Sequence, residues 1–259
     1  MQNTPYGAAG QQPYGQQPYY GGQPVMDSRA AYSYERAEHV SVTKAYGEMT
    51  IGLVVTAVVA ILTQMTGFYR SFIMATGAFG VWIPAIVQIA LAIWLGAKVM
   101  TMKPSTARVA FYVFAALMGV TMSTIFGAYN LGTIGFAFIV CAVFYLALTM
   151  FGLTTKGNML KAGPILMIGL IVLILAEVVL MFVAPTDTML KVITALGIIL
   201  FAGMTIYDAQ FTKRVFAQYA NQGPEMIQRV SILCALNLYL DFINMFLYIL
   251  QLFGLNSRD

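Results

Sequence analysis

Long apolar runs, separated by short polar breaks, make up most of the chain after Lys44. A helix that crosses a lipid bilayer needs about 20 mostly apolar residues. The runs that approach or exceed this length are Met49–Thr66, Gly77–Val99, Ala107–Ala128, Ile134–Leu153, Gly163–Ala184, Met189–Asp208 and Val230–Phe253. The breaks contain glycine, proline and asparagine, which end helices. The pattern predicts an all-α integral membrane protein, an up-and-down bundle of seven helices with short loops.

The N-terminal segment has a different pattern. Residues 5–24 repeat proline, tyrosine, glycine and glutamine and contain almost no aliphatic side chains. Such a segment cannot bury enough apolar surface to offset the entropy lost on ordering. We therefore predict a disordered cytoplasmic tail over residues 1–45, followed by a membrane domain over residues 46–259.

Composition narrows the class of protein further. Apolar residues make up 59% of the chain, charged residues 9%, and the mean hydropathy is +0.77, whereas soluble domains carry about a quarter charged residues. This excludes an ordinary cytosolic enzyme and a nucleic-acid binder. The single histidine, His39, lies in the polar N-terminal region, which excludes histidine-based metal or triad chemistry inside the bundle. We expect the lipid bilayer to be the partner, and we expect neither an enzymatic activity nor a cofactor.

Basic residues predict the orientation, because cytoplasmic loops carry an excess of lysine and arginine. Seven crossings place eleven of the 14 basic residues on the side of the N-terminus. The other side receives Arg70, Lys191 and Arg258. The asymmetry predicts a cytoplasmic N-terminus in a protein of the cell membrane.

Three acidic residues lie within apolar runs: Glu177, Asp208 and Asp241. An ionised carboxylate at the centre of a membrane costs about 3 kcal/mol on insertion scales. No lysine or arginine lies at comparable depth in the sequence to neutralise it. A proton, a bound cation or a water-filled cavity can compensate, and each points to proton or cation handling. The alternative is a protonated acid that hydrogen-bonds a neighbouring helix as a packing contact.

A polar stripe surrounds Asp241 on the last predicted helix. Its members are spaced by four and three residues, which places them on one helix face: Asn237, Asp241, Asn244, Tyr248 and Gln251. On the preceding helix, Thr194, Thr205, Asp208 and Thr212 also share a face. The two helices are expected to run antiparallel, so Asp208 and Asp241 can meet. Their oxygen ligands suit Ca²⁺ or H⁺ rather than soft metals, and a pair in contact shares a proton.

An intramembrane aspartyl protease is a minor alternative. Such enzymes share a proton between two carboxylates, and Tyr207-Asp208 matches one half of their sequence pattern. The other half, Gly-x-Gly-Asp, is absent because the chain reads Leu-Tyr-Leu-Asp over residues 238–241.

The run ALNLYLDFINMFLYILQLFG over residues 235–254 resembles the signature of the Bax inhibitor-1 family. Tyr207-Asp208 and the Phe111-Tyr112 pair also resemble family positions, and the likeness covers about residues 45–254. The chain departs from the family at Gly157-Asn158, where Arg-Asp is common.

The resemblance implies a bundle with the last helix central and a pH-sensitive Ca²⁺ leak gated by two aspartates. The family's aspartates correspond to Asp208 and Asp241, with Tyr207 beside them. A basic residue near the end of the second helix is expected as a latch, and the nearest candidate is Lys98. Glu177 has no counterpart in the motif and is expected to be secondary. The alternative is a non-transporting regulatory or stress-protection protein that binds other membrane proteins.

Overall fold

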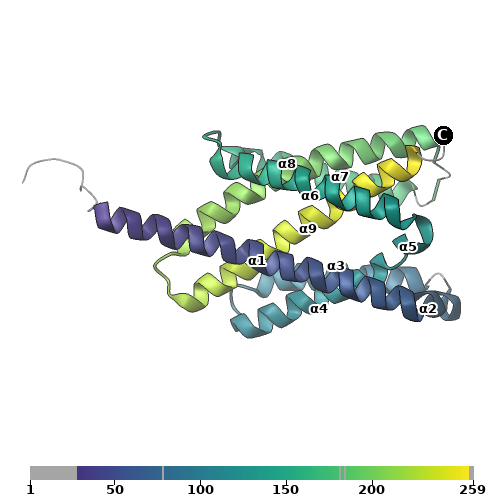
Figure 1. The fold of residues 1–259 in the computed structure, drawn as a ribbon, viewed down its shortest axis with the longest axis horizontal. Helices are drawn as coiled ribbons and strands as arrows, with labels where there is room; N and C mark the ends of the chain where they lie inside the picture. The colour runs from purple at the N-terminus through teal and green to yellow at the C-terminus, as the bar shows by residue number, and fades with distance from the viewer. Residues whose placement is uncertain (1–27, 78, 181, 184, 257–259) are drawn as a thin grey trace, which may run out of the picture.

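The structure, a computed structural model, describes residues 28–77, 79–180, 182–183 and 185–256, with side chains from Ser41 onward. These residues form helices and turns and contain no strand. The elements are α1 (Ser28–Thr66), α2 (Phe68–Thr76), α3 (Phe79–Lys98), α4 (Pro104–Met122), α5 (Ile125–Ala128), α6 (Leu131–Thr154), the 3-10 helix η1 (Met159–Ala162), α7 (Gly163–Leu180), α8 (Asp187–Tyr219) and α9 (Pro224–Asn256). Figure 1 shows them arranged as one elongated bundle.

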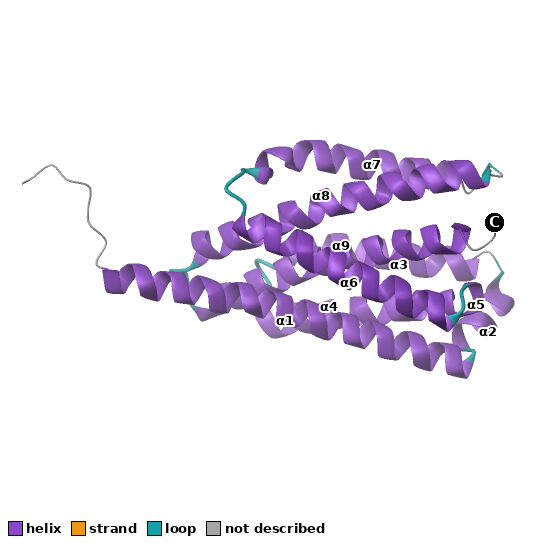
Figure 2. Cartoon of the chain, turned by 45° about the horizontal axis from the view of Figure 1, so that its top comes forward, coloured by secondary structure: helices purple, strands orange, loops and turns teal. Residues whose placement is uncertain are grey.

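Seven of the described helical segments are long and apolar enough to cross a membrane, which confirms the predicted seven-helix bundle. The last of them is central: 72% of the spanning window of α9 is buried, against 6–33% for the other six. α9 packs against α8, α1, α6 and α4. Figures 1 and 2 show it running through the middle of the bundle while α7 lies at the periphery.

Two helices extend well beyond the apolar runs that predicted them. α1 begins at Ser28, before the apolar run that starts at Met49, so residues 28–45, which the sequence analysis places in the tail, are helical. Residues 1–27, the rest of that tail, lie outside the described residues. α8 continues to Tyr219, so Asp208 lies inside a helix and not at its end. Hydropathy reports where a helix meets lipid, whereas glycine and proline, here Gly223-Pro224, decide where it stops.

Two glycines allow the helices around the centre to approach closely. A Cβ added at Gly119 of α4 would lie 2.5 Å from the Thr56 carbonyl oxygen of α1. A Cβ added at Gly152 of α6 would lie 2.8 Å from the Ile206 carbonyl oxygen of α8. Both distances are too short for a real side chain, so these helix pairs pack backbone to backbone, as small residues allow in membranes.

Candidate functional site

Asp208 of α8 and Asp241 of α9 face each other in the centre of the bundle. Only 4% of Asp208 and 1% of Asp241 is exposed. Their carboxyl groups are close enough to hydrogen-bond each other, which requires a proton on one of them because two carboxylates have no donor. Among the described residues, neither carboxylate forms an ion pair with a lysine or arginine. The aspartates that the sequence predicted to meet are therefore in contact.

The local sequence explains why the two carboxyls point inward. Thr194, Thr205 and Thr212 are as buried as Asp208, so the predicted polar face of α8 is an interior face. On α9, Asn237 lies one turn before Asp241, and its Nδ2 donates a hydrogen bond of 3.5 Å to Asp208 Oδ1. The amide of Asn237 therefore helps to hold Asp208 against α9.

The rest of the polar stripe has other partners. Asn244 Nδ2 donates to the carbonyl oxygen of Leu240 in its own helix at 2.7 Å. Gln251 Oε1 accepts a hydrogen bond of 3.0 Å from Thr194 Oγ1. Tyr248 donates to Glu177 Oε1 of α7. The stripe thus links α9 to both α8 and α7, but only Asn237 and Asp241 reach Asp208.

Glu177 has the interhelical hydrogen bond expected of a secondary acid. Its carboxylate lies on the peripheral helix α7, where its side chain is exposed at the surface of the protein. The hydroxyl of Tyr248 reaches it from the central helix. This contact is separate from the aspartate pair, since Tyr248 lies two turns along α9 from Asp241.

Two predicted site residues do not lie at the pair. Tyr207 stacks on Phe211, with ring centroids 6.2 Å apart, and its ring lies against Gly163 at the start of α7. Successive helix residues point about 100° apart, so the neighbour of Asp208 faces another helix. Lys98 is exposed at the end of α3, which packs on α4, and among the described residues it pairs with neither aspartate. The predicted latch is therefore not formed in this structure.

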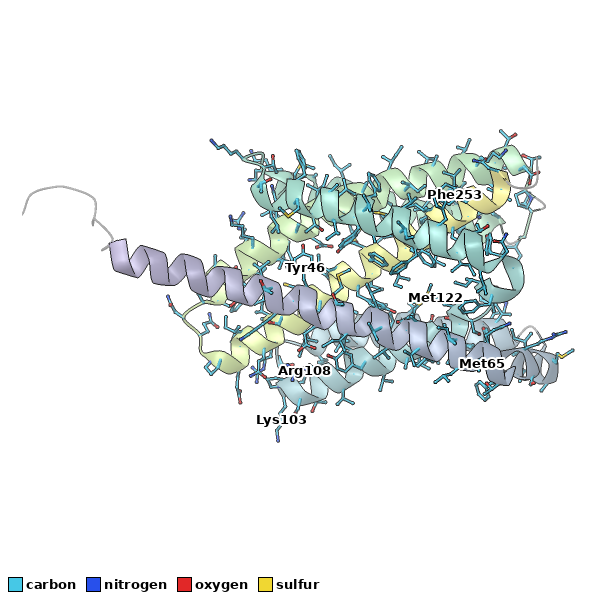
Figure 3. The ribbon with its side chains drawn as sticks, viewed as in Figure 1. Tyr46, Met65, Lys103, Arg108, Met122 and Phe253 are labelled. Atoms are coloured by element: carbon cyan, nitrogen blue, oxygen red, sulfur yellow. The ribbon has the colours of Figure 1, made fainter. Side chains whose placement is uncertain are left out.

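Hydroxyl groups from two further helices complete the surroundings of the pair. Tyr46 of α1 and Tyr145 of α6 are close enough to interact electrostatically with both aspartates. Thr149 of α6 lies beside Tyr46, and Thr212 of α8 lies beside Cys234 of α9. Figure 3 labels Tyr46 beside α1, at about the same level along the bundle as Arg108.

Most of these oxygen atoms lack a hydrogen bond. The buried side-chain atoms without a partner in the described part of the chain are Tyr46 Oη, Thr149 Oγ1, Thr212 Oγ1, Asp241 Oδ2 and Arg229 Nε. One of the five, Asp241 Oδ2, belongs to the aspartate pair itself. Tyr46 Oη interacts with both aspartates, Thr149 lies beside Tyr46, and Thr212 lies one turn from Asp208 on α8. Because buried polar atoms are normally paired, a cluster of unpaired oxygens indicates a place for water or an ion.

The sequence reasoning missed Tyr46, Tyr145 and Thr149. A signal was available for the two on α6: Cys141, Tyr145, Thr149 and Gly152 recur every three or four residues and are buried on one face of an otherwise apolar helix. Tyr46 follows Ala45, which is fully buried, but it precedes the apolar run and therefore fell at the predicted tail boundary.

The chemistry of this centre is that of hard oxygen ligands. Among the described residues no group of three or more His, Cys, Asp or Glu side chains is placed to hold a metal ion. A Ca²⁺ ion takes about six to eight oxygen ligands, and neutral oxygens and water commonly supply most of them. Asp208 and Asp241, the amide of Asn237 and the hydroxyls of Tyr46 and Thr149 carry oxygen atoms of this chemical kind.

The sequence profile of a family described as inhibitor of apoptosis-promoting Bax1 matches residues 38–258. The chain belongs to the Bax inhibitor-1 family. It is a multi-pass membrane protein, and the match covers all seven spanning segments. Curated relatives are similar over most of their length. YbhL, an inner membrane protein of Escherichia coli K12, is 34% identical over 211 residues, which is 82% of this chain and 89% of the relative. A protein of Borreliella burgdorferi is 32% identical over 216 residues, 83% of this chain and 92% of the relative.

Proposed function

We propose that this member of the Bax inhibitor-1 family is a passive, pH-sensitive cation leak, chiefly for Ca²⁺, controlled by Asp208 and Asp241. The observation that carries the proposal is the buried carboxyl pair surrounded by unpaired hydroxyl oxygens. A structural hydrogen bond between two helices does not need three unpaired hydroxyls near it and an unpaired oxygen on one of its own carboxyls. A site that exchanges protons, water and a cation does.

The protonation state of the pair sets the force between α8 and α9. With one proton shared, the two carboxyls hydrogen-bond and hold the helices together. With both ionised, they repel each other in a medium of low dielectric, and either the helices separate or a divalent cation enters. The near-complete burial of both side chains corresponds to the closed path, since an ion can reach them only when the helices move.

The cell membrane is the proposed location, with the N-terminus in the cytoplasm. The basic excess at the end where α1, α4 and α9 begin supports this orientation. The E. coli relative is named an inner membrane protein, which agrees with a plasma-membrane location.

A second candidate is a regulator that binds other membrane proteins and transports nothing. The description of the family, inhibitor of apoptosis-promoting Bax1, favours it. Fold and family alone do not decide between these functions. The aspartate centre favours the leak, because a scaffold has no use for a buried carboxyl pair.

The test is Ca²⁺ flux into liposomes that contain the purified protein and a luminal Ca²⁺ indicator, measured across pH. Asp208→Asn and Asp241→Asn are expected to change the flux and its pH response. Asp187→Asn is the matched control, because Asp187 is an exposed aspartate in the first turn of the same helix as Asp208. If the wild-type protein unfolds cooperatively on heating, and is therefore folded, but carries no Ca²⁺ flux at any pH, the result would favour the regulator.

A further inference from the structure

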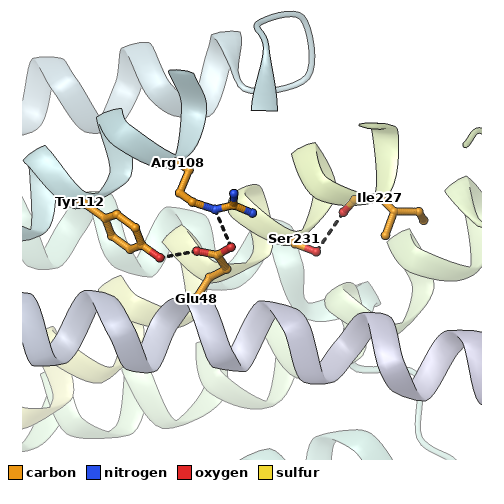
Figure 4. Close-up of polar contacts among 5 residues, drawn as sticks. All are labelled: Glu48, Arg108, Tyr112, Ile227 and Ser231. Carbon is orange, nitrogen blue, oxygen red and sulfur yellow. Dashed lines mark hydrogen bonds and ion pairs between the residues drawn. The ribbon is translucent and has the colours of Figure 1, made fainter. Parts of the chain in front are cut away.

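A polar cavity lies between α1, α4 and α9, away from the aspartate pair. Its volume is about 390 Å³, and its polar lining comes from Lys44, Glu48, Arg108, Gln228 and Ser231. Three helices that are distant in sequence thus contribute to one cavity. Figure 4 shows Arg108, Glu48 and Ser231 from these helices around it.

Both oxygens of the carboxylate in this cavity accept a hydrogen bond from the protein. Arg108 Nε donates to Glu48 Oε1 at 2.7 Å, and Tyr112 Oη donates to Glu48 Oε2 at 2.5 Å. Only 13% of the Glu48 side chain is exposed, against 39% for Arg108. Glu48 therefore orients the guanidinium, and its negative charge is already paired with Arg108.

The positively charged groups that line the cavity are free to bind an anion. Arg108 uses only Nε, and in the described part of the chain its two terminal amino groups have no hydrogen bond; Figure 4 shows them pointing away from Glu48. Lys44 is exposed on the same wall. Two cations and one carboxylate leave the cavity with a net positive charge. The terminal amino groups of an arginine fixed through Nε suit the paired oxygens of a phosphate.

An apolar stripe leads from the cavity along α1. It begins at Ile51, which lines the cavity, and continues at steps of three and four residues on one helix face. All its members are exposed large apolar side chains: Ile51, Val54, Val58, Ile61 and Met65. A cationic cavity that opens onto a lipid-facing apolar stripe suits a molecule with a phosphate at one end and acyl chains at the other.

We propose that this cavity binds the phosphate of an anionic phospholipid, with Arg108 and Lys44 on the phosphate oxygens and the acyl chains along α1. Glu48 is a positioning residue that holds the guanidinium. The site lies at the end of the bundle where α4 begins, close to Lys103 (Figure 3), as expected of a headgroup-binding pocket between spanning helices. The proposal does not depend on whether the protein conducts Ca²⁺.

The test uses the full-length protein in detergent micelles, titrated with phosphatidylglycerol, with phosphatidylcholine and with inorganic phosphate, and followed by native mass spectrometry. We expect phosphatidylglycerol to bind in preference to phosphatidylcholine, and inorganic phosphate alone not to bind or compete. Each of Lys44→Gln and Arg108→Gln should weaken phosphatidylglycerol binding about five-fold. Lys103→Gln, which removes a basic residue outside the cavity lining, should leave binding unchanged.

The variants separate the outcomes. Lys44→Gln leaves the Glu48–Arg108–Tyr112 contacts intact, so it remains informative if Arg108→Gln fails to fold. Binding of inorganic phosphate that is lost in the same variants would overturn the lipid and identify a free-phosphate site. If Lys103→Gln weakened phosphatidylglycerol binding as much as the other two variants, the lipid would be attracted by basic charge in general, which would also overturn the proposal. Wild-type affinity in both Lys44→Gln and Arg108→Gln would overturn it as well.

Discussion

The ring of Tyr248 on α9 lies directly against Gly197 of α8. A Cβ added at Gly197 would come within 2.7 Å of three ring atoms. The absence of a side chain at Gly197 lets the tyrosine pass over α8 and reach Glu177 on α7. Gly197 therefore leaves the space that Tyr248 of the central helix α9 needs to hydrogen-bond Glu177 of the peripheral helix α7.

This contact predicts the effect of Gly197→Ala. The new methyl group displaces the ring, which also packs on Phe201 at a centroid distance of 5.9 Å. Over-packing of this kind costs about 1–3 kcal/mol, and we expect a lower melting temperature in detergent. The control is Gly96→Ala, since nothing lies within 4 Å of a Cβ at that helical position. It should be neutral or stabilising by up to about 1 kcal/mol, because alanine is the better helix former.

Glu177→Gln should have a small effect on flux. Glutamine keeps the length of the side chain and an oxygen that accepts the hydrogen bond from Tyr248, so the link between α7 and α9 survives. Flux measured in liposomes across pH should keep the wild-type pH response with a modest change in amplitude. A loss as large as that from the aspartate variants would mean that the ion path runs through α7.

The unpaired hydroxyl of Tyr46 predicts opposite effects on stability and on Ca²⁺ binding. Removing a buried hydroxyl that has no partner should leave the melting temperature of Tyr46→Phe unchanged or raised. Ca²⁺ binding should weaken if the hydroxyl is a ligand. Tyr239→Phe is the matched control, because its hydroxyl hydrogen-bonds Thr56 at 2.6 Å. That change should cost about 1 kcal/mol of stability and leave Ca²⁺ binding unaltered. Equal behaviour of the two variants would remove Tyr46 from the site.

The seven spans and the two aspartates could be predicted from the sequence, because the free energy of placing a segment in the bilayer depends on the residues of that segment alone. Asp208 and Asp241 are charged residues in apolar runs, so they can be identified without any knowledge of packing. Helix ends were harder: α1 and α8 continue past their apolar runs, because good helix formers outside the membrane carry no hydropathy signal.

The partners of the aspartates could not be read in the same way. Tyr46 and Tyr145 reach the pair from α1 and α6. Which helices lie side by side around α9 is decided by packing at positions such as Gly119, between α4 and α1, and Gly152, between α6 and α8. Tyr207 was misplaced for the opposite reason. Adjacency in sequence suggested proximity, but the helical rotation turns it toward α7.

The aspartate pair gives the decisive prediction. Asp208→Asn and Asp241→Asn remove a charge while keeping nearly the same shape, so the bundle should fold. If both carboxylates bind one Ca²⁺, each single variant should weaken binding strongly and the double variant should add little, because groups that act as a unit are non-additive.

Ca²⁺ should raise the melting temperature of the wild type more at about pH 8 than at about pH 5, since a cation competes with protons for carboxylate ligands. The double variant should lose this difference, and its flux should no longer respond to pH. Asp187→Asn should behave as the wild type in every measurement. A pH-dependent Ca²⁺ flux that persists unchanged in the double variant would move the gate to the loops and leave Asp208 and Asp241 as a hydrogen bond between two helices.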